Sequence, residues 1–447
     1  MSVYIKVPPR ADYFWETMAR SGYTLDLALS ELIDNAISAQ ADRITILKKW
    51  KGVNSMIGIL DNGIGMNSED LITAMIPMAR DPNATRDEND LGRYSLGLKS
   101  GSMSQATKFY VWTKKDSKIN GVCQDQEVIK AKGDFVIVGD PEIPIEVEKW
   151  YGELEKQESG TLVVWSSLRE YIKSEEDDAD AKNIFMKKTA AAEERLGMIF
   201  HSYLDDQRLK FTTITGGEPI KSWNPFSFSS SKYAHKEPPV DISIKPQSKI
   251  ILQSYVIPDL SKLNEEDRKI AHGPLGNMID AQGIYLYRND RLLIGGGWLG
   301  LGGWFKEYQY QLARIRIDLP NTVTIDSDWN LDFKKGKADI PNKYIDEIMK
   351  HCNSCRKMAR ERLASNKSRG PRASKNKERM WIDDSVDDIV MRYKINRKNK
   401  SVKEFIRELL SPHDDEALSL LHEISKEFPY DEYEERLHEI WLKKEIK

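Results

Sequence analysis

The chain has 447 residues, of which 40% are hydrophobic and 31% are charged, and its formal net charge at pH 7 is -3. This length suits two or three domains with real cores, and the near-neutral charge excludes nucleic-acid binding through overall positive charge. No apolar run approaches a membrane span and residues 1–15 lack a secretion signal, so we expect a cytoplasmic protein without a membrane partner. The three cysteines (Cys123, Cys352 and Cys355) cannot form a disulfide framework, and the lone CxxC lacks a second ligand pair for zinc.

Residues 1–172 are predicted to form a first, α/β domain. Apolar periodicity predicts helices over about residues 13–20, 24–40, 67–78 and 97–105. Alternating or continuous apolar runs predict strands over about residues 43–47, 56–60, 108–113, 121–131, 134–138 and 160–166. Residues 80–91 are polar without periodicity, which is typical of a lid over a binding site.

The helix predicted over 24–40 carries Glu31, Asp34 and Asn35 at positions i, i+3 and i+4. This spacing places two carboxyl groups and an amide on one shared face. Asparagine can bind Mg²⁺ through its carbonyl oxygen, and a nearby glutamate can take a proton from water. On its own, such a pair of acids is usually a solvated helix face.

Two glycine-containing turns complete the pattern. The first, Asp61-Asn62-Gly63-Ile64-Gly65, ends a strand and presents a carboxylate that can accept a hydrogen bond from a purine amino group. The second begins at Gly92 and opens a helix at Gly97, close to the cation of Lys99, so its N–H groups and dipole can hold phosphates. Together these parts predict a purine triphosphate bridged by Mg²⁺. The absence of a GxxxxGK[ST] motif excludes a P-loop protein.

In this order and spacing, the motifs ELIDNAISAQA, LDNGIGM and LGRYSLGLKSGSM resemble those of the GHKL ATPases, and most closely those of the microrchidia (MORC) ATPases and their prokaryotic relatives. The resemblance implies an α/β sandwich with a mixed sheet. It implies that Glu31 is the general base, that Asn35 is the Mg²⁺ ligand and that Asp61 binds adenine. It also implies nucleotide contacts for the remaining residues of these motifs and one later threonine: Asp34, Gly63, Gly65, Met66, Gly92, Arg93, Gly97, Leu98, Lys99 and Thr161. Relatives often have glycine where this chain has Ser95, so we expect slow turnover.

Residues 173–345 are predicted to form a second domain, which resembles the βαβ transducer domain of MutL, gyrase B and MORC proteins. Strong strand candidates cover residues 251–257, 283–294 and 312–319, the second of them with a turn at Asn289-Asp290. In that family a lysine from this domain reaches the γ-phosphate. Three lysines of one loop (Lys334, Lys335 and Lys337) are candidates here, and we favour Lys335.

The end of the chain carries weaker signals. We expect a basic helix and linker over 346–379, because residues 350–379 hold eleven Lys and Arg against two Glu, which suits phosphate contact or a solvated linker. We expect a small helical domain over 380–447.

The resemblance implies an ATP-driven dimeric clamp on DNA that acts in repair, compaction or defence against foreign DNA. The alternative is an ATP-gated scaffold or chaperone with a protein partner. A histidine-kinase reading is disfavoured, since no histidine precedes His201.

Overall fold

The computed structural model describes residues 4, 5, 7, 9–79, 81, 91, 96–213, 219–227, 235–245, 248–259, 262–332, 334–367, 381–383, 393–395, 400, 402 and 403. The chain divides into two compact units. The first comprises residues 1–306 and 311–357, and the second comprises residues 307–310 and 358–447. Each unit is described by itself. Within the described residues, no helix is long and apolar enough to cross a membrane.

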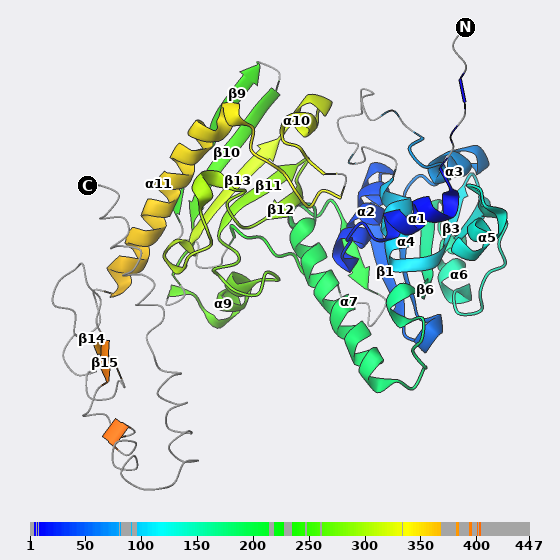
Figure 1. Ribbon diagram of the computed structural model, residues 1–447, viewed down its shortest axis with the longest axis horizontal. Coiled ribbons are helices and arrows are strands. Elements are labelled where there is room, and N and C mark those ends of the chain that lie inside the picture. Colours follow the sequence, from blue (N-terminus) through cyan, green and yellow to red (C-terminus); the bar gives the residue numbers. More distant parts are fainter. Residues whose placement is uncertain are drawn as a thin grey trace. The chain divides into compact units, whose positions relative to one another are not determined.

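A seven-stranded sheet organises the first part of the larger unit (Figure 1). Its strands are β1 (Arg43–Lys49), β2 (Met56–Asp61), β3 (Ala106–Lys115), β4 (Lys118–Asp125), β5 (Val138–Gly139), β6 (Gly160–Leu168) and β7 (Lys210–Thr213). Their order is β5-β4-β3-β6-β2-β1-β7, antiparallel throughout except for the parallel pair of β1 and β7. The mixed sheet expected for this domain is therefore confirmed. The sheet extends beyond the predicted boundary at residue 172, because β7 is one of its strands.

The helices of this part are α1 (Ala11–Ala19), α2 (Leu25–Ser38), α3 (Ser68–Met75), α4 (Gly97–Gln105), α5 (Gln126–Lys132), α6 (Glu148–Lys156), α7 (Ala179–Ile199) and α8 (His201–Asp205). The strand prediction for residues 126–131 was wrong, because a local capping signal outweighs the apolar pattern. The Asp125 side chain accepts a hydrogen bond from Glu127 N, and Gly133 ends the helix with a left-handed φ of 67°. Only Val138 and Gly139 form the strand expected over 134–138, and α6 was not predicted.

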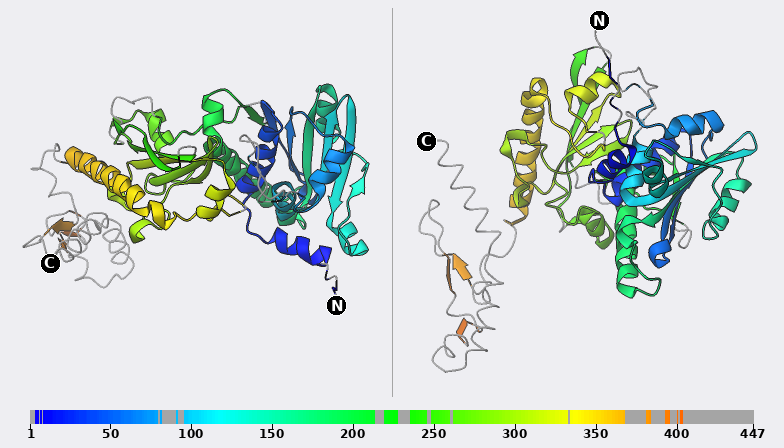
Figure 2. Two further views of the ribbon diagram at one scale, coloured as in Figure 1. Left: turned by 90° about the horizontal axis from the view of Figure 1, so that it is seen from above. Right: turned by 45° about the vertical axis from the view of Figure 1, so that its right-hand side comes forward.

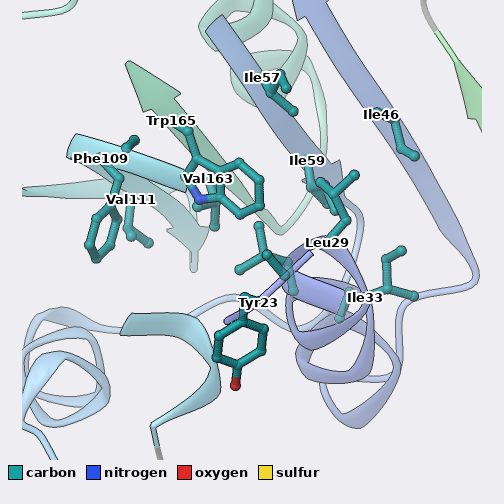
Figure 3. Packing of buried hydrophobic residues seen from close by; sticks show 14 of the residues in the cluster. Tyr23, Leu29, Ile33, Ile46, Ile57, Ile59, Phe109, Val111, Val163 and Trp165 are labelled. Carbon is teal, nitrogen blue, oxygen red and sulfur yellow. The ribbon is translucent and has the colours of Figure 1, made fainter. Parts of the chain in front are cut away.

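Side chains alternate between the two faces of this sheet, and each face has its own core. On one face, Ile57, Ile59, Val111 and Val163 pack with buried residues of α1, α2 and α4. Figure 3 shows Leu29 and Ile33 of α2 together with these strand residues. The other face packs mainly against Trp150 and Leu154 of α6. The helices therefore cover both faces of the sheet (Figure 1, Figure 2).

A second sheet follows in the same unit. Its strands are β8 (His235–Lys236), β9 (Val240–Lys245), β10 (Ser248–Val256), β11 (Gly283–Arg288), β12 (Arg291–Gly295) and β13 (Ala313–Leu319). The predicted turn between β11 and β12 is confirmed, since Asn289 and Asp290 have φ of 48° and 60°. β11 and β13 are parallel, but β12 and 3₁₀ turns connect them in place of the α-helix that a βαβ unit would have.

Three helices accompany the second sheet: α9 (Glu265–His272), α10 (Val323–Asp328) and α11 (Asn342–Lys367). α11 agrees closely with the predicted basic helix. Both cysteines of its CxxC are fully buried, and Cys355 Sγ donates to Tyr255 O of β10 at 3.3 Å. The described residues contain no cluster of three or more His, Cys, Asp or Glu that could hold a metal.

In the second unit, β14 (Trp381–Asp383) pairs antiparallel with β15 (Tyr393–Ile395). The all-helical prediction for 380–447 was therefore wrong for these two segments. Apart from these strands, almost all of that stretch lies outside the described residues.

Candidate active site

A cavity of about 450 Å³ opens where α2 meets one end of the first sheet. Residues far apart in the chain line it, from α2, from the ends of β2 and β6, from α4 and from the loop that follows α10. The predicted site residues among them are Glu31, Asn35, Asp61, Gly65, Met66, Gly97, Leu98, Lys99, Thr161 and Lys335. Gly63 and Asp34 are not among the lining residues. Gly92, Arg93 and Ser95, like most of the predicted lid, lie outside the described residues.

Three polar groups stand together at one end of the cavity because of strand register. Asp61 pairs with Thr161, and Thr161 pairs with Thr113 on the next strand. All three continue the face that packs against α2, and Asp61 and Thr161 line the cavity where the apolar residues end. Asp61 Oδ1 accepts hydrogen bonds from Gly63 N at 2.8 Å and Thr161 N at 3.2 Å. Burial raises the pKa of the Asp61 carboxyl to about 6.

The glycines of the turn after β2 leave no room for a side chain. A Cβ on Gly65, whose φ is 64°, would lie 1.9 Å from Lys114 O. A Cβ on Gly63 would lie 2.8 Å from Ala39 O at the end of α2. Both contacts are far below van der Waals distance, so these glycines allow the turn to lie against β3 and α2. This turn directs the Asp61 carboxylate and Met66 into the cavity.

Glu31 and Asn35 project into the cavity one helical turn apart on α2. Glu31 is only 5% exposed, and its Oε1 atom has no hydrogen-bond partner within the described part of the protein. Burial raises the pKa of the Glu31 carboxyl; the nearby Asp34 charge raises it further and Lys335 opposes both. A buried carboxylate with a raised pKa and one free oxygen is suited to accept a proton from water.

Helix α4 begins directly beside this carboxylate. A Cβ built on Gly97 would lie 2.1 Å from Glu31 Oε2, so glycine makes room for the Glu31 carboxylate. Lys99, one turn into α4, is 1% exposed and donates to Ala74 O at 2.7 Å. Its ammonium group therefore lies at the cavity wall, on the carbonyl of a residue near the end of α3.

Lys335 brings a second cation to the site from the loop after α10. Its Nζ atom lies 2.6 Å from Asp34 Oδ2 and 3.2 Å from Glu31 Oε2. The neighbouring candidates point elsewhere: Lys334 Nζ donates to Ser21 O, and Lys337 is exposed. Of the three lysines left open by the sequence, Lys335 is the one that lines the cavity.

Comparison with known proteins agrees with this geometry. Residues 23–161 match the model of the histidine kinase-, DNA gyrase B- and HSP90-like ATPase family. The chain is 38% identical to ATPase MORC2B of Mus musculus and 34% identical to ATPase MORC2 of Homo sapiens, each over 115 residues. Those residues are 25% of this chain and 11% of each relative. It is also 34% identical over 90 residues, 20% of this chain, to DNA mismatch repair protein MutL of Chlorobaculum tepidum, of which 14% is covered.

Residues 23–161 form a GHKL-type ATPase domain. The predicted resemblance to MORC and MutL proteins is thereby confirmed, for a stretch that spans about a tenth of the length of the MORC relatives. The family is one of ATPases, and its match covers Glu31, Asn35, Asp61, Gly97 and Thr161. Lys335 lies outside the matched residues.

One side chain of the GHKL-type domain, that of Asn35, fits Mg²⁺ as a protein ligand beside phosphates. Asn35 is exposed to the cavity, and its side-chain amide makes no hydrogen bond within the described residues. Mg²⁺ usually takes one or two protein oxygens and fills its remaining positions with water and phosphate oxygens. Asn35 would hold the ion, and the ion would neutralise phosphate charge.

Three polar residues around the site were missed by the sequence analysis. Arg288 of β11 lines the cavity, donates to both oxygens of Asp326 at 2.8 and 3.0 Å, and donates to Leu91 O at 3.1 Å. Arg291 of β12 lies 3.2 Å from Asp34. Nothing local in the sequence marks them, because the carboxylates with which the two arginines pair are 38 and 257 residues away.

Replacing Asp61 with asparagine tests the adenine assignment. The new amide keeps an oxygen that can accept from Gly63 N and Thr161 N, but it turns the other acceptor into a donor that opposes the adenine amino group. We expect ATP affinity to fall ten- to a hundredfold, the size of one hydrogen bond to a charged group. Titration of a fluorescent ATP analogue measures this. In the parent chain, affinity should also decline below about pH 6, as Asp61 gains its proton. Unchanged binding by the variant would remove Asp61 from the base pocket.

Proposed function

We propose that the chain binds ATP with Mg²⁺ and hydrolyses it slowly. Glu31 acts as the general base, Asn35 holds Mg²⁺ and Asp61 binds adenine. Gly97 and Lys99 bind the phosphates, and the same role is proposed for Gly92 and Arg93, which lie outside the described residues. The observation that carries this proposal is the convergence in one cavity of acid, amide and lysine groups from α2, the end of β2, α4 and the loop after α10. Phosphate release from ATP, with and without Mg²⁺, tests it.

Glu31 takes the proton of an attacking water in this reaction. Its Oε1 has no partner within the described protein, and its Oε2 faces Lys335. A water bound to Oε1 would be oriented by a buried base and would lie close to the Lys335 cation. Negative charge that develops on the transferred phosphoryl group is then stabilised by the cations lining the cavity.

Lys335 is proposed to be the residue that senses the γ-phosphate. Replacing it with alanine should lower the ATP turnover number about a hundredfold, which is typical for loss of one preorganised charge partner in a transition state. Lys337→Ala provides the matched control, because Lys337 belongs to the same loop and is exposed. Its turnover should stay within twofold of the parent. Steady-state phosphate release measures both. Equal losses in the two variants would mean that the loop has only a structural role.

ATP-dependent dimerisation is the second part of the proposal. Large apolar side chains are exposed near the N-terminus and along α3 (Tyr4, Ile5, Val7, Ile72 and Ile76). Exposed apolar groups of this kind suit a protein–protein contact. We propose that the N-terminal segment crosses to a second copy when ATP is bound. Light scattering with a non-hydrolysable ATP analogue tests this, and a monomer at all nucleotide concentrations would overturn it.

The dimer is proposed to act as a clamp on DNA, in repair, compaction or defence against foreign DNA. The support is the basic composition of residues 350–379 and the likeness to a protein named for DNA mismatch repair. The alternative is an ATP-gated scaffold for a protein partner, which the same exposed apolar groups would serve. DNA that binds the dimer and stimulates ATP turnover supports the clamp. DNA that does neither favours the scaffold.

A further inference from the structure

We propose that Asp34 is a positioning residue that holds the Lys335 ammonium group beside Glu31. This inference rests on the proposed ATP hydrolysis and changes the role expected for Asp34. The Asp34 side chain is 1% exposed and is not among the residues that line the cavity. It therefore acts on the reaction through its neighbours and not through contact with nucleotide.

The carboxylate of Asp34 lies between two cations from the second part of the unit. Lys335 Nζ lies 2.6 Å from Asp34 Oδ2, which is shorter than its 3.2 Å distance to Glu31 Oε2. Arg291 Nε lies 3.2 Å from Asp34 on the other side. This buried carboxylate is thus ion-paired with both cations, and its negative charge holds them together.

Arg291 fixes the position of that charge. Its side chain is 1% exposed, and its Nη2 donates to Ser30 Oγ on α2 at 2.9 Å while Nη1 donates to Leu292 O at 3.0 Å. The guanidinium group is thus held by its own strand and by the helix that carries Asp34. A rigid planar donor of this kind leaves the carboxylate with little freedom to turn, so Lys335 meets an acceptor of defined position.

The backbone around Lys335 is also held in an unusual state. Lys335 has a φ of 56°, a conformation that side-chain-bearing residues seldom adopt. Asp332 stabilises the loop, because its Oδ1 accepts from Gly336 N at 2.7 Å and from Lys337 N at 2.9 Å. Strain of this kind persists only where surrounding contacts impose it, and here it directs the lysine toward α2.

Holding Lys335 on Asp34 has two consequences for the base. The ammonium group touches only one oxygen of Glu31, so the other oxygen stays available for water. Lys335 has two described carboxylate partners, Asp34 and Glu31. If Asp34 lost its charge, only Glu31 would remain as a carboxylate among these two. Lys335 would then lose its shorter contact and leave its place beside Glu31. This change would slow the chemical step and leave the binding of adenine, proposed to occur at Asp61, unaffected.

Amine labelling of the nucleotide-free protein tests the inference without any ATP. A brief pulse of an acylating reagent, followed by mass spectrometry of peptides, reports the reactivity of Lys335 against that of exposed Lys337 in the same chain. Asp34→Asn should raise the Lys335 to Lys337 labelling ratio at least fivefold. Arg291→Lys, which keeps the charge but loses the planar donors, should raise it by a smaller factor. An unchanged ratio in both variants would overturn the proposal.

A double-mutant cycle supplies the kinetic test. Asp34→Asn should lower kcat about tenfold with KM for ATP within twofold of the parent. In a Lys335→Met background, the same substitution should change neither constant by more than twofold, because the group it positions is gone. Equal losses in both backgrounds, or a raised KM, would overturn the proposal and return Asp34 to a nucleotide-binding or structural role. If the parent itself hydrolyses no ATP, the proposed function fails, whereas the labelling ratio still decides the role of Asp34.

Discussion

Replacing Glu31 with glutamine is expected to lower ATP turnover about a thousandfold, within the range that a general base contributes. Glutamine has nearly the same shape, so the packing of α2 against the sheet is kept. It cannot take a proton from water, and it removes the charge that faces Lys335 at 3.2 Å. Since adenine is proposed to bind at Asp61, on another element, ATP affinity should stay within a few-fold of the parent.

The slow variant should also accumulate in the nucleotide-bound state. If ATP closes a dimer and hydrolysis opens it, Glu31→Gln mixed with ATP should give more dimer than the parent in light scattering. Asp70→Asn is the matched control, because Asp70 also lines the cavity but, among the described residues, its carboxylate pairs with Lys115 near the surface and not with Lys335. Turnover by Glu31→Gln equal to that of the parent would remove Glu31 from the role of base.

Much of the first domain could be predicted because its signals are local. The apolar spacing of α2, the Asn67 cap of α3 and the glycines after β2 each lie within a few residues of the feature that they determine. Strand register then brings Asp61 beside Thr161. Local patterns were misleading at 126–131, where a capping aspartate and a left-handed glycine make a helix from an apolar run.

The rest of the site depends on contacts that no local pattern encodes. Lys335 reaches Glu31 across 304 residues, and Arg291 reaches Asp34 across 257. The sequence contains three equivalent lysines in that loop, and only the fold shows which one faces α2. The role of Gly97 is similar: its position suggested phosphate binding, but its distance from Glu31 shows that it also makes room for the base.

Replacing Gly97 with alanine should therefore lower ATP turnover about a hundredfold. The added methyl group would lie 2.1 Å from Glu31 Oε2 and 2.9 Å from Glu31 Cδ, so the carboxylate must move. Glu31 is buried and held by Lys335, so its carboxylate cannot move without breaking the contact with Lys335. A displacement of about 1 Å in a catalytic group can reduce the rate a hundredfold. Steady-state phosphate release measures the effect.

Gly101→Ala in the same helix separates this effect from a change in helix stability. A Cβ on Gly101 would have its closest contact at 3.5 Å, to Ala28 Cα, which is an ordinary van der Waals distance. Both substitutions add one methyl group to α4, and alanine at the interior position Gly101 raises the helix propensity by roughly 1 kcal/mol. Only Gly97→Ala affects the base, so Gly101→Ala should retain turnover within twofold and unfold at a similar or higher temperature. Loss of turnover in both variants would mean that α4 tolerates no added methyl group and that the contact with Glu31 has no special part in catalysis.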